Sequence, residues 1–330
     1  GRGPARQGPI HLLQKIKMTD TKSELSQLKT WTTVVADTGD IDEIARVRPT
    51  EATTNPSLIL KAAMTPRGEA VLREARRAPE SASDRIDRVL TAFGAEILRH
   101  IPGRVSTEVD ARLSFNTRAT VEKARRIIAL YEALGISRER ILIKIACTWE
   151  GTQAARVLEL EGIHCNMTLI FDLPQAIAAS QARATLISPF VGRIYDWYKA
   201  KEGALWDETA MAGVNDPGVQ SVTRIWKALK ASGSKTQVMG ASFRNKGEIT
   251  ALAGCDLLTI APKFIDELNT TFAPLPRVLD AEKLKSVEPL TISECDFRYA
   301  LNASPLASGK LAQGIRSFAA DTEKLEGLLH

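Results

Sequence analysis

The chain has 330 residues, of which 44% are hydrophobic and 25% are charged. These values are typical of a soluble globular protein, and no apolar run approaches the roughly 18 residues that a membrane span needs. The net charge of +5 would favour a polyanionic partner if it were spread over the chain. Four basic residues and no acid lie in the first 17 residues, however, so the remainder carries only +1. We therefore expect neither a nucleic-acid nor a membrane partner.

The segment 1–17 (GRGPARQGPIHLLQKIK) is interpreted as an expression leader, because Met18 opens a plausible native start and the segment has no long apolar signal core. A transit-like extension is the alternative. We expect residues 18–330 to form a single domain, since eight-stranded α/β barrels reach this size as one unit.

The four cysteines are Cys147, Cys165, Cys255 and Cys295. They are widely spaced, without a C-x-x-C pair and without histidines at zinc-like spacing. We therefore predict neither a disulfide scaffold nor a metal site, and we expect a cytoplasmic protein.

From about Lys29 onward, short β-rich runs alternate with helical stretches, which is typical of a parallel sheet covered by helices. In chain order we predict strands at 31–38 (WTTVVADT), 52–55 (ATTN), 104–110 (RVSTEVD), 140–146 (RILIKIA), 164–171 (HCNMTLIF), 185–190 (TLISPF), 236–242 (TQVMGAS) and 257–262 (LLTIAP). Eight such units favour a closed α/β barrel, the (β/α)8 TIM barrel. An open doubly wound sheet is the alternative, weakened because no G-x-G-x-x-G follows the first strand.

Helices are predicted between these strands. The clearest lies at 121–135, where an apolar stripe ends at Gly135. The stripe consists of Val121, Ala124, Ile127, Ile128, Tyr131 and Leu134. The stretch from about Lys61 to His100 is too long for a simple crossover, so we expect an inserted helical pair there. The region from about Ile292 to His330 should add helices outside the barrel.

The predicted strand at 140–146 is apolar apart from Lys144 and its leading arginine. A lysine is almost never fully buried without a partner or a function. Burial disfavours the ammonium form and so favours the free amine that a Schiff-base nucleophile requires. The alternative is a structural lysine, which reaches solvent at the strand end or pairs with an acid.

Polar residues alternate along other predicted strands, so that they share one face. The pairs are Thr33 with Asp37, Thr53 with Asn55, Ser106 with Glu108 and Asp110, Asn166 with Thr168, and Ser188 with Phe190. Near the carboxyl ends of barrel strands, such groups would converge on one catalytic face. Two acids near one lysine would supply proton transfer for carbonyl chemistry, although each acid alone could equally form a salt bridge.

Two arginines follow late strands. Arg193 comes after the sixth strand, and Arg244 comes after the seventh, where it should open a helix. Barrels often bind phosphate at loops after late strands, and a guanidinium binds phosphate oxygens in a planar fork. The two arginines together therefore favour a phosphorylated substrate.

At these residues the sequence resembles the transaldolase family, from about Leu28 to the C-terminus. The segments TTVVADTGD, EATTNPSLIL, PGRVSTEVDARLSF, ILIKIACTWEG, NMTLIF, ISPFVGRIYDWYK and GASFRN look like family segments in family order. The most specific are ATTNPSL and IKIACTWEG.

The resemblance implies a homodimeric class I aldolase-type barrel with Lys144 as the Schiff-base lysine and no metal or organic cofactor. It implies that Asp37 assists proton transfer at the cleaved bond, and that Glu108 and Thr168 position the catalytic water. The implied substrate-binding residues are Asn55, Ser106, Asn166 and Ser188 for the dihydroxyacetone hydroxyls, Arg193 and Arg244 for the phosphate, and Thr53 and Phe190 for the pocket lining.

The implied reaction moves a dihydroxyacetone unit from sedoheptulose 7-phosphate to glyceraldehyde 3-phosphate, giving erythrose 4-phosphate and fructose 6-phosphate, in the non-oxidative pentose phosphate pathway. A fructose 6-phosphate aldolase on the same barrel is the alternative, but such aldolases tend to have tyrosine at the position of Phe190 and lack the extra helices. One departure is Cys147, where many relatives have serine. We expect little effect on mechanism, because Cys147 should point away from Lys144.

Overall fold

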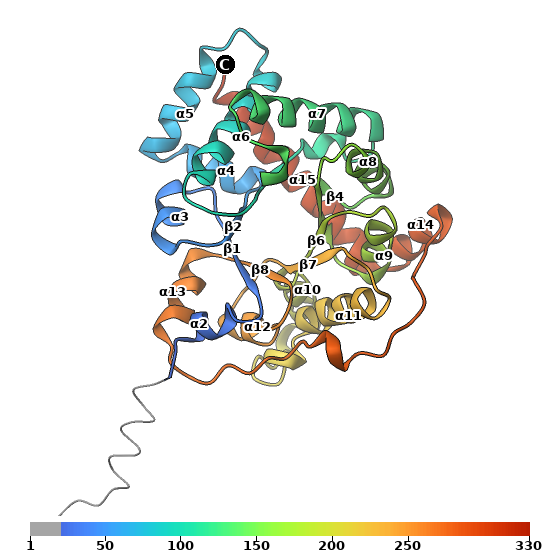
Figure 1. Ribbon diagram of the computed structural model, residues 1–330. Coiled ribbons are helices and arrows are strands. Elements are labelled where there is room, and N and C mark those ends of the chain that lie inside the picture. Colours follow the sequence, from blue (N-terminus) through green and yellow to red (C-terminus); the bar gives the residue numbers. More distant parts are fainter. Residues whose placement is uncertain (1–20) are drawn as a thin grey trace, which may run out of the picture.

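The structure is a computed structural model that describes residues 21–330, in which eight parallel strands close into a barrel (Figure 1). The strands are β1 (Thr33–Asp37), β2 (Glu51–Thr53), β3 (Val105–Glu108), β4 (Ile141–Ala146), β5 (Cys165–Ile170), β6 (Leu186–Pro189), β7 (Gln237–Gly240) and β8 (Leu257–Ile260). Each strand pairs with the next in the chain, and β8 pairs with β1. The eight predicted strands and the closed barrel are thus confirmed. The expected leader, 1–17, lies outside the described residues.

An apolar layer fills the barrel interior. It consists of Val35, Leu142, Leu186, Met239 and Leu257, which come from five different strands and are all buried. Because alternate residues of a strand face the same side, the residue two positions further along each strand also points into the barrel. On β1, β4, β6 and β8 those positions hold polar residues described below, whereas on β7 the position holds Ala241.

A ring of helices covers the strands, and a large apolar core lies between the two layers. The ring and its flank contain α2 (Glu24–Leu28), α3 (Ile41–Val47), α6 (Ala82–Leu98), α7 (Thr117–Ala133), α8 (Trp149–Leu160), α9 (Leu173–Gln181), α10 (Gly192–Glu202), α11 (Pro217–Ala231), α12 (Lys246–Thr250) and α13 (Pro262–Thr270). Short 3₁₀ turns are η1 (Ala111–Leu113), η2 (Arg138–Arg140), η3 (Gly203–Leu205), η4 (Gly213–Asn215) and η5 (Ala281–Lys283).

Helix α7 buries the predicted apolar stripe, with one exception. Leu134 is 59% exposed, because the helix ends at Ala133 and the chain then turns through Gly135, whose φ is +79°. The assignment of Leu134 to the stripe was wrong for this reason.

The inserted helical pair is α4 (Pro56–Ala63) and α5 (Pro66–Arg76). The predicted insertion, 61–100, also included α6, but α6 packs against β3 and between α3 and α7 and is therefore a helix of the ring. The predicted insertion, 61–100, therefore began and ended too far toward the C-terminus, since the inserted pair spans 56–76. A Pro at the start of both α4 and α5 shows where each helix begins, since proline is well accommodated in a first turn.

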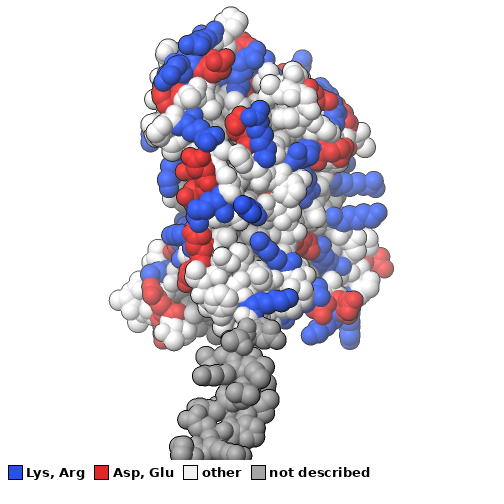
Figure 2. Space-filling model, turned by 60° about the vertical axis from the view of Figure 1, so that its left-hand side comes forward, with Lys and Arg blue, Asp and Glu red and all other residues white. Residues whose placement is uncertain are grey.

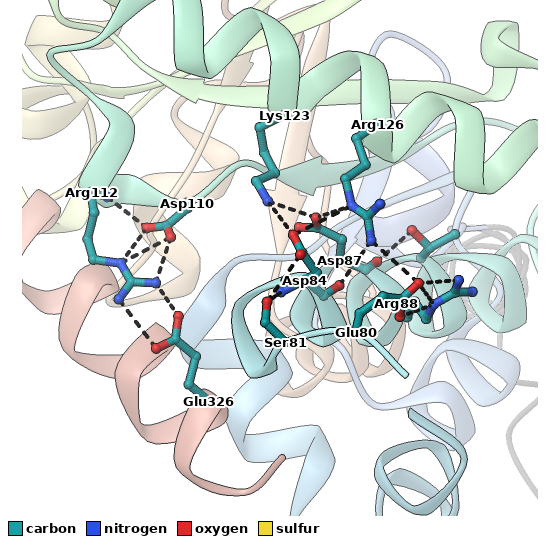
Figure 3. Close-up of polar contacts among 11 residues, drawn as sticks. Glu80, Ser81, Asp84, Asp87, Arg88, Asp110, Arg112, Lys123, Arg126 and Glu326 are labelled. Atoms are coloured by element: carbon teal, nitrogen blue, oxygen red, sulfur yellow. Dashed lines mark hydrogen bonds and ion pairs between the residues drawn. The ribbon is translucent and has the colours of Figure 1, made fainter. Parts of the chain in front are cut away.

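The C-terminal region forms α14 (Glu294–Ala303) and α15 (Pro305–Gly327), as expected. Helix α15 contacts α4, η1, β5 and α10, so it lies across the end of the barrel where the strands finish. Its Phe318 belongs to a buried cluster with Leu169, Phe171 and Phe190. Arg112 of η1 bonds to both Asp110 and Glu326, which fastens α15 to the loop after β3 (Figure 3).

A second set of ion pairs holds α6 against α7. The buried carboxylate of Asp87 lies 2.8 Å from Lys123 Nζ and 2.8 Å from Arg126 Nε (Figure 3).

Nowhere between residues 21 and 330 does a helix combine the length and the apolarity needed to cross a bilayer.

Candidate active site

The strand register places the polar residues beside one another in two groups. Asp37 lies opposite Thr53, and Thr53 opposite Ser106. Glu108 lies opposite Lys144, and Lys144 opposite Asn166. Asp37 and Lys144 each stand two residues beyond a member of the apolar layer, Val35 and Leu142 respectively. The candidate site is therefore a polar layer on an apolar base, at the carboxyl ends of the strands.

Lys144 is only 5% exposed. Its Nζ donates a hydrogen bond to the carbonyl oxygen of Thr54 (3.3 Å) and lies 3.9 Å from Glu108 Oε2. The amine thus has one neutral acceptor and one acid close by, and the lysine side chain is almost entirely buried. This environment, unlike a strand-end lysine that reaches solvent, suits a nucleophilic amine.

Both acids have altered proton affinity. Burial raises the pKa of Glu108 from 4.5 to about 7, against the opposing charges of Lys144 and Arg193. Burial also raises the pKa of Asp37, against Lys144, the hydroxyl of Thr53 and Arg193. Glu108 can therefore hold or release a proton near neutral pH, which a general acid or base must do.

Hydroxyl and amide groups form a chain along the interior. Ser188 Oγ donates to Asn166 Oδ1 (2.8 Å), and Asn166 Nδ2 donates to Ser106 Oγ (3.1 Å). On the other side, Thr53 Oγ1 donates to Asp37 Oδ1 (3.2 Å). These polar groups orient one another in a buried space, so they can present fixed donors and acceptors to a polyhydroxy ligand.

The side chain of Thr168 is fully buried, and its hydroxyl makes no hydrogen bond within residues 21–330. The next residue, Leu169, has a φ of +56° at an irregularity in the pairing of β5 with β6. This positive φ turns Leu169 into the cluster beneath α15 instead of continuing the alternation.

Arg193 and Arg244 lie near each other at the mouth. Burial and the charge of Arg244 lower the pKa of Arg193, while Glu108, Asp37 and Asp196 act in the opposite direction. The guanidinium of Arg193 lies over the ring of Phe190, 4.8 Å from its centroid, and over Phe318. Two neighbouring guanidinium groups form a natural site for an oxyanion.

Two predictions about this region need correction. Arg244 does not open a helix: it lies two residues before α12, and its side chain pairs with Asp196 (2.7 Å). Asp110, which was expected on the face of Ser106 and Glu108, instead caps η1 and pairs with Arg112. Both residues follow the end of a strand, where the alternation of faces no longer holds.

Asn55 has a structural partner, since its side chain accepts the N–H of Leu58 and caps α4. Phe190 is buried in edge contact with Phe171, with 5.2 Å between the ring centroids.

Cys147 lies in the outer core, with its Sγ 3.4 Å from the carbonyl oxygen of Gln175, so it does point away from the barrel interior. All four cysteines are free.

Sequence reasoning missed Thr259 of β8, whose hydroxyl lies 2.6 Å from that of Thr53. The available signal was the same as for Lys144, namely one polar residue in an otherwise apolar strand. It also missed Asp196, which is three residues after Arg193 and pairs with Arg244. In the part of the chain that the structure describes, no group of three or more His, Cys, Asp or Glu side chains could hold a metal ion.

A closed α/β barrel with a buried amine, two acids and two arginines at the carboxyl ends of its strands defines a barrel enzyme. Comparison with known proteins identifies its family. Residues 34–329 match the family described as Transaldolase/Fructose-6-phosphate aldolase. A relative named Transaldolase, from Methylibium petroleiphilum (strain ATCC BAA-1232 / LMG 22953 / PM1), is 55% identical over 311 residues, which cover 93% of this chain and 98% of the relative. The chain therefore belongs to the transaldolase/fructose-6-phosphate aldolase family, as a transferase of the transaldolase type.

Proposed function

We propose that the enzyme transfers a dihydroxyacetone unit from sedoheptulose 7-phosphate to glyceraldehyde 3-phosphate, giving erythrose 4-phosphate and fructose 6-phosphate, in the non-oxidative pentose phosphate pathway. The observation that carries this proposal is the enclosed amine of Lys144, 3.9 Å from Glu108 Oε2 and next to a chain of hydroxyl and amide groups. The amine can react with the carbonyl group of a ketone, and the chain of hydroxyl and amide groups can form hydrogen bonds to the hydroxyls of a polyol.

In this proposal, the Lys144 amine attacks the ketose carbonyl, and loss of water gives a protonated imine. Asp37 accepts the proton of the C4 hydroxyl as the C3–C4 bond breaks. The imine takes up the electron pair of that bond as an enamine, and the aldose product leaves. The enamine then adds to the acceptor aldehyde, and hydrolysis of the new imine frees the ketose.

Glu108 and Thr168 would position the water that is lost and regained in this cycle. The raised pKa of Glu108 supports this role, because a carboxyl that titrates near 7 can pass a proton in either direction. Thr168 has a buried hydroxyl without a hydrogen-bond partner among the described residues. This hydroxyl is therefore available to bind the catalytic water.

The remaining residues would bind the substrate. Asn55, Ser106, Asn166 and Ser188 would hold the dihydroxyacetone hydroxyls, Thr53 and Phe190 would line the pocket, and Arg193 and Arg244 would bind the phosphate. The like charges of the two arginines favour an anion between them, which supports a phosphorylated substrate. We propose that no metal or organic cofactor takes part.

Chemical trapping tests the imine. Borohydride treatment with fructose 6-phosphate should reduce the imine to a stable dihydroxyacetone-derived adduct, which peptide mass mapping should locate on Lys144. The Lys144→Ala variant should remain unlabelled and inactive. Labelling at another residue, or an active enzyme that cannot be labelled, would overturn the mechanism.

The alternative, a fructose 6-phosphate aldolase, predicts release of free dihydroxyacetone. Phe190 supports transfer, because its apolar ring packs on Phe171 and under Arg193 and offers the enamine no proton. We therefore expect Phe190→Tyr to increase release of dihydroxyacetone relative to transfer, measured on fructose 6-phosphate with and without acceptor. An unchanged ratio of release to transfer would remove Phe190 as the discriminating residue. Phe190→Leu, which adds no hydroxyl, is the control.

A further inference from the structure

Two carboxyl groups outside the barrel interior, Asp216 and Glu248, are completely buried. Helix α12, which carries Glu248, packs against η4, the turn that leads into Asp216, and each carboxyl group shifts the pKa of the other. Asp216 caps α11, where its Oδ1 accepts the N–H groups of Gly218 (2.8 Å) and Val219 (3.3 Å). Glu248 lies in α12, and its Oε1 accepts the backbone N–H of Arg244 (2.5 Å). One oxygen of each carboxyl group is therefore occupied by the main chain.

The other two oxygens, Asp216 Oδ2 and Glu248 Oε2, are buried and have no further partner within residues 21–330. Ionised carboxylates only accept hydrogen bonds, so two of them cannot bond to each other. One of the two groups must therefore carry a proton. A single shared proton satisfies both of the remaining oxygens.

The surrounding charges do not neutralise the pair. Asp196 of α10 acts on Asp216 through its charge, and its carboxylate is paired with the side chain of Arg244. Lys246 of α12 pairs with Glu24 of α2 (3.0 Å). Neither Asp216 nor Glu248 has a cationic partner in the described chain. Burial accordingly raises the pKa of Glu248 to about 8, reinforced by the neighbouring carboxylate of Asp216, to which only the protonated Glu248 can donate.

The pair is connected to the arginine at the mouth through the segment 241–245. On one side, the carbonyl oxygens of Ala241 and Ser242 accept the N–H groups of Val191 and Gly192, just before Arg193. A side chain at Gly192 would meet the Ser242 carbonyl oxygen at 2.5 Å, so the two turns are in close contact. On the other side, Glu248 holds the N–H of Arg244. Glu248 is therefore the contact that fixes the main chain of Arg244.

We propose that Asp216 and Glu248 are a proton-sharing pair of positioning residues for Arg244, and that binding of the substrate's phosphate depends on their shared proton. The inference rests on the proposed role of Arg244 in phosphate binding. Loss of the proton at alkaline pH leaves two buried like charges, which repel each other. Glu248 then moves, the N–H of Arg244 loses its acceptor, and the guanidinium loses its position.

Glu248→Gln tests the pair. The amide carbonyl can still accept the N–H of Arg244, and the amide NH₂ can donate to Asp216 at every pH, as the shared proton does. In the wild type, KM for fructose 6-phosphate should rise about tenfold between pH 7 and pH 9.5, the size expected for loss of one charge-assisted contact. The kcat value should change far less. Glu248→Gln should keep the low KM throughout, whereas the same rise in the variant would overturn the proposal.

Fructose, which lacks the phosphate, is the control substrate. With fructose, the pH profile of kcat/KM should be the same for the wild type and for Glu248→Gln. A difference of equal size for both substrates would refute a role through phosphate. Titration of Glu108 is common to both proteins and cancels in the comparison. Glu159→Gln is the matched variant, because Glu159 also accepts backbone N–H groups, from Cys165 and Thr185, away from Arg244. It should behave as the wild type, and a profile like that of Glu248→Gln would show that the effect is not local.

Calorimetric binding of inorganic phosphate to Arg244→Ala separates this inference from the proposed function. If Arg244→Ala binds phosphate as the wild type does, the phosphate site itself is wrong and the inference falls with it. If Arg244→Ala weakens binding but Glu248→Gln retains the wild-type loss of affinity between pH 7 and pH 9.5, only the role of the pair is wrong. If Arg244→Ala weakens phosphate binding and binding to Glu248→Gln does not depend on pH, both the phosphate site and the role of the pair are supported.

Discussion

Lys144 and Glu108 show how position alone can change the chemistry of ordinary residues. They lie opposite each other on neighbouring strands, with 3.9 Å between Nζ and Oε2, and both are almost fully buried. The alternation along β3 and β4 predicted that each residue would face the interior. It could not predict the proton affinity of Glu108, because that depends on how completely the barrel and α15 exclude solvent.

Replacing Glu108 tests the consequence of its raised pKa for stability. Its pKa is 4.5 in the unfolded chain and about 7 in the fold, so its contribution is fully present below pH 4.5 and is lost as the pH rises through 7. Glu108→Gln has no such loss. The difference in free energy of unfolding between Glu108→Gln and the wild type should therefore shift by about 3 kcal/mol in favour of the variant between pH 4.5 and pH 8. Denaturant titration at both pH values measures this shift. A difference independent of pH would contradict the assigned pKa.

The same residue has a separate effect on turnover. Glu108→Ala should keep the fold, as judged by circular dichroism, but lose about 10²- to 10⁴-fold in kcat, the usual contribution of a general acid or base. Near-normal activity would show that Glu108 does not relay the proton.

Among the secondary-structure elements, α6, α7 and β3 depend on one close contact. Tyr131 of α7 is completely buried, and its hydroxyl lies 2.6 Å from that of Thr107 of β3. It passes directly over Gly94 of α6, where an added Cβ would lie 1.7 Å from the tyrosine oxygen. The apolar stripe predicted the inward face of α7. It gave no indication that Gly94, in the middle of a helix, makes room for a side chain of the next helix.

We expect Gly94→Ala to destabilise the protein by about 3 kcal/mol, because it overpacks the core and displaces the Tyr131 hydroxyl from Thr107. Thermal or denaturant unfolding measures this. The double variant Gly94→Ala with Tyr131→Phe should be less destabilised than the sum of the two single variants, since the clashing oxygen is gone. Strict additivity would mean that the two residues do not interact.

At the scale of the whole molecule, the distribution of surface charge can be followed on one face. Figure 2 shows a face on which acidic and basic side chains are interspersed, in keeping with the near-neutral charge of the chain outside its first 17 residues. We propose that residues 18–330 act as one domain, and that the enzyme works in the cytoplasm as a homodimer.

The dimer is directly testable. Light scattering on the purified protein should give twice the chain mass of 36.0 kDa at micromolar concentration. A mass of one chain over the same range would refute the homodimer. Removal of residues 1–17 should leave the measured association unchanged, because that segment lies outside the proposed domain.

By itself, the sequence determined the eight strands, the inward direction of Lys144 and Asp37, and the family. A strand with a period of two, bounded by helical patterns, needs no distant contact to be recognised. Only the tertiary structure decided which groups meet. Thr53 reaches Thr259, Arg112 reaches Glu326, and Asp216 approaches Glu248 only because β8 returns to β1, α15 crosses the barrel end, and α12 packs against η4, the turn before α11. The effects that tune the site, burial and hydrogen bonding between distant segments, exist only once the barrel has closed.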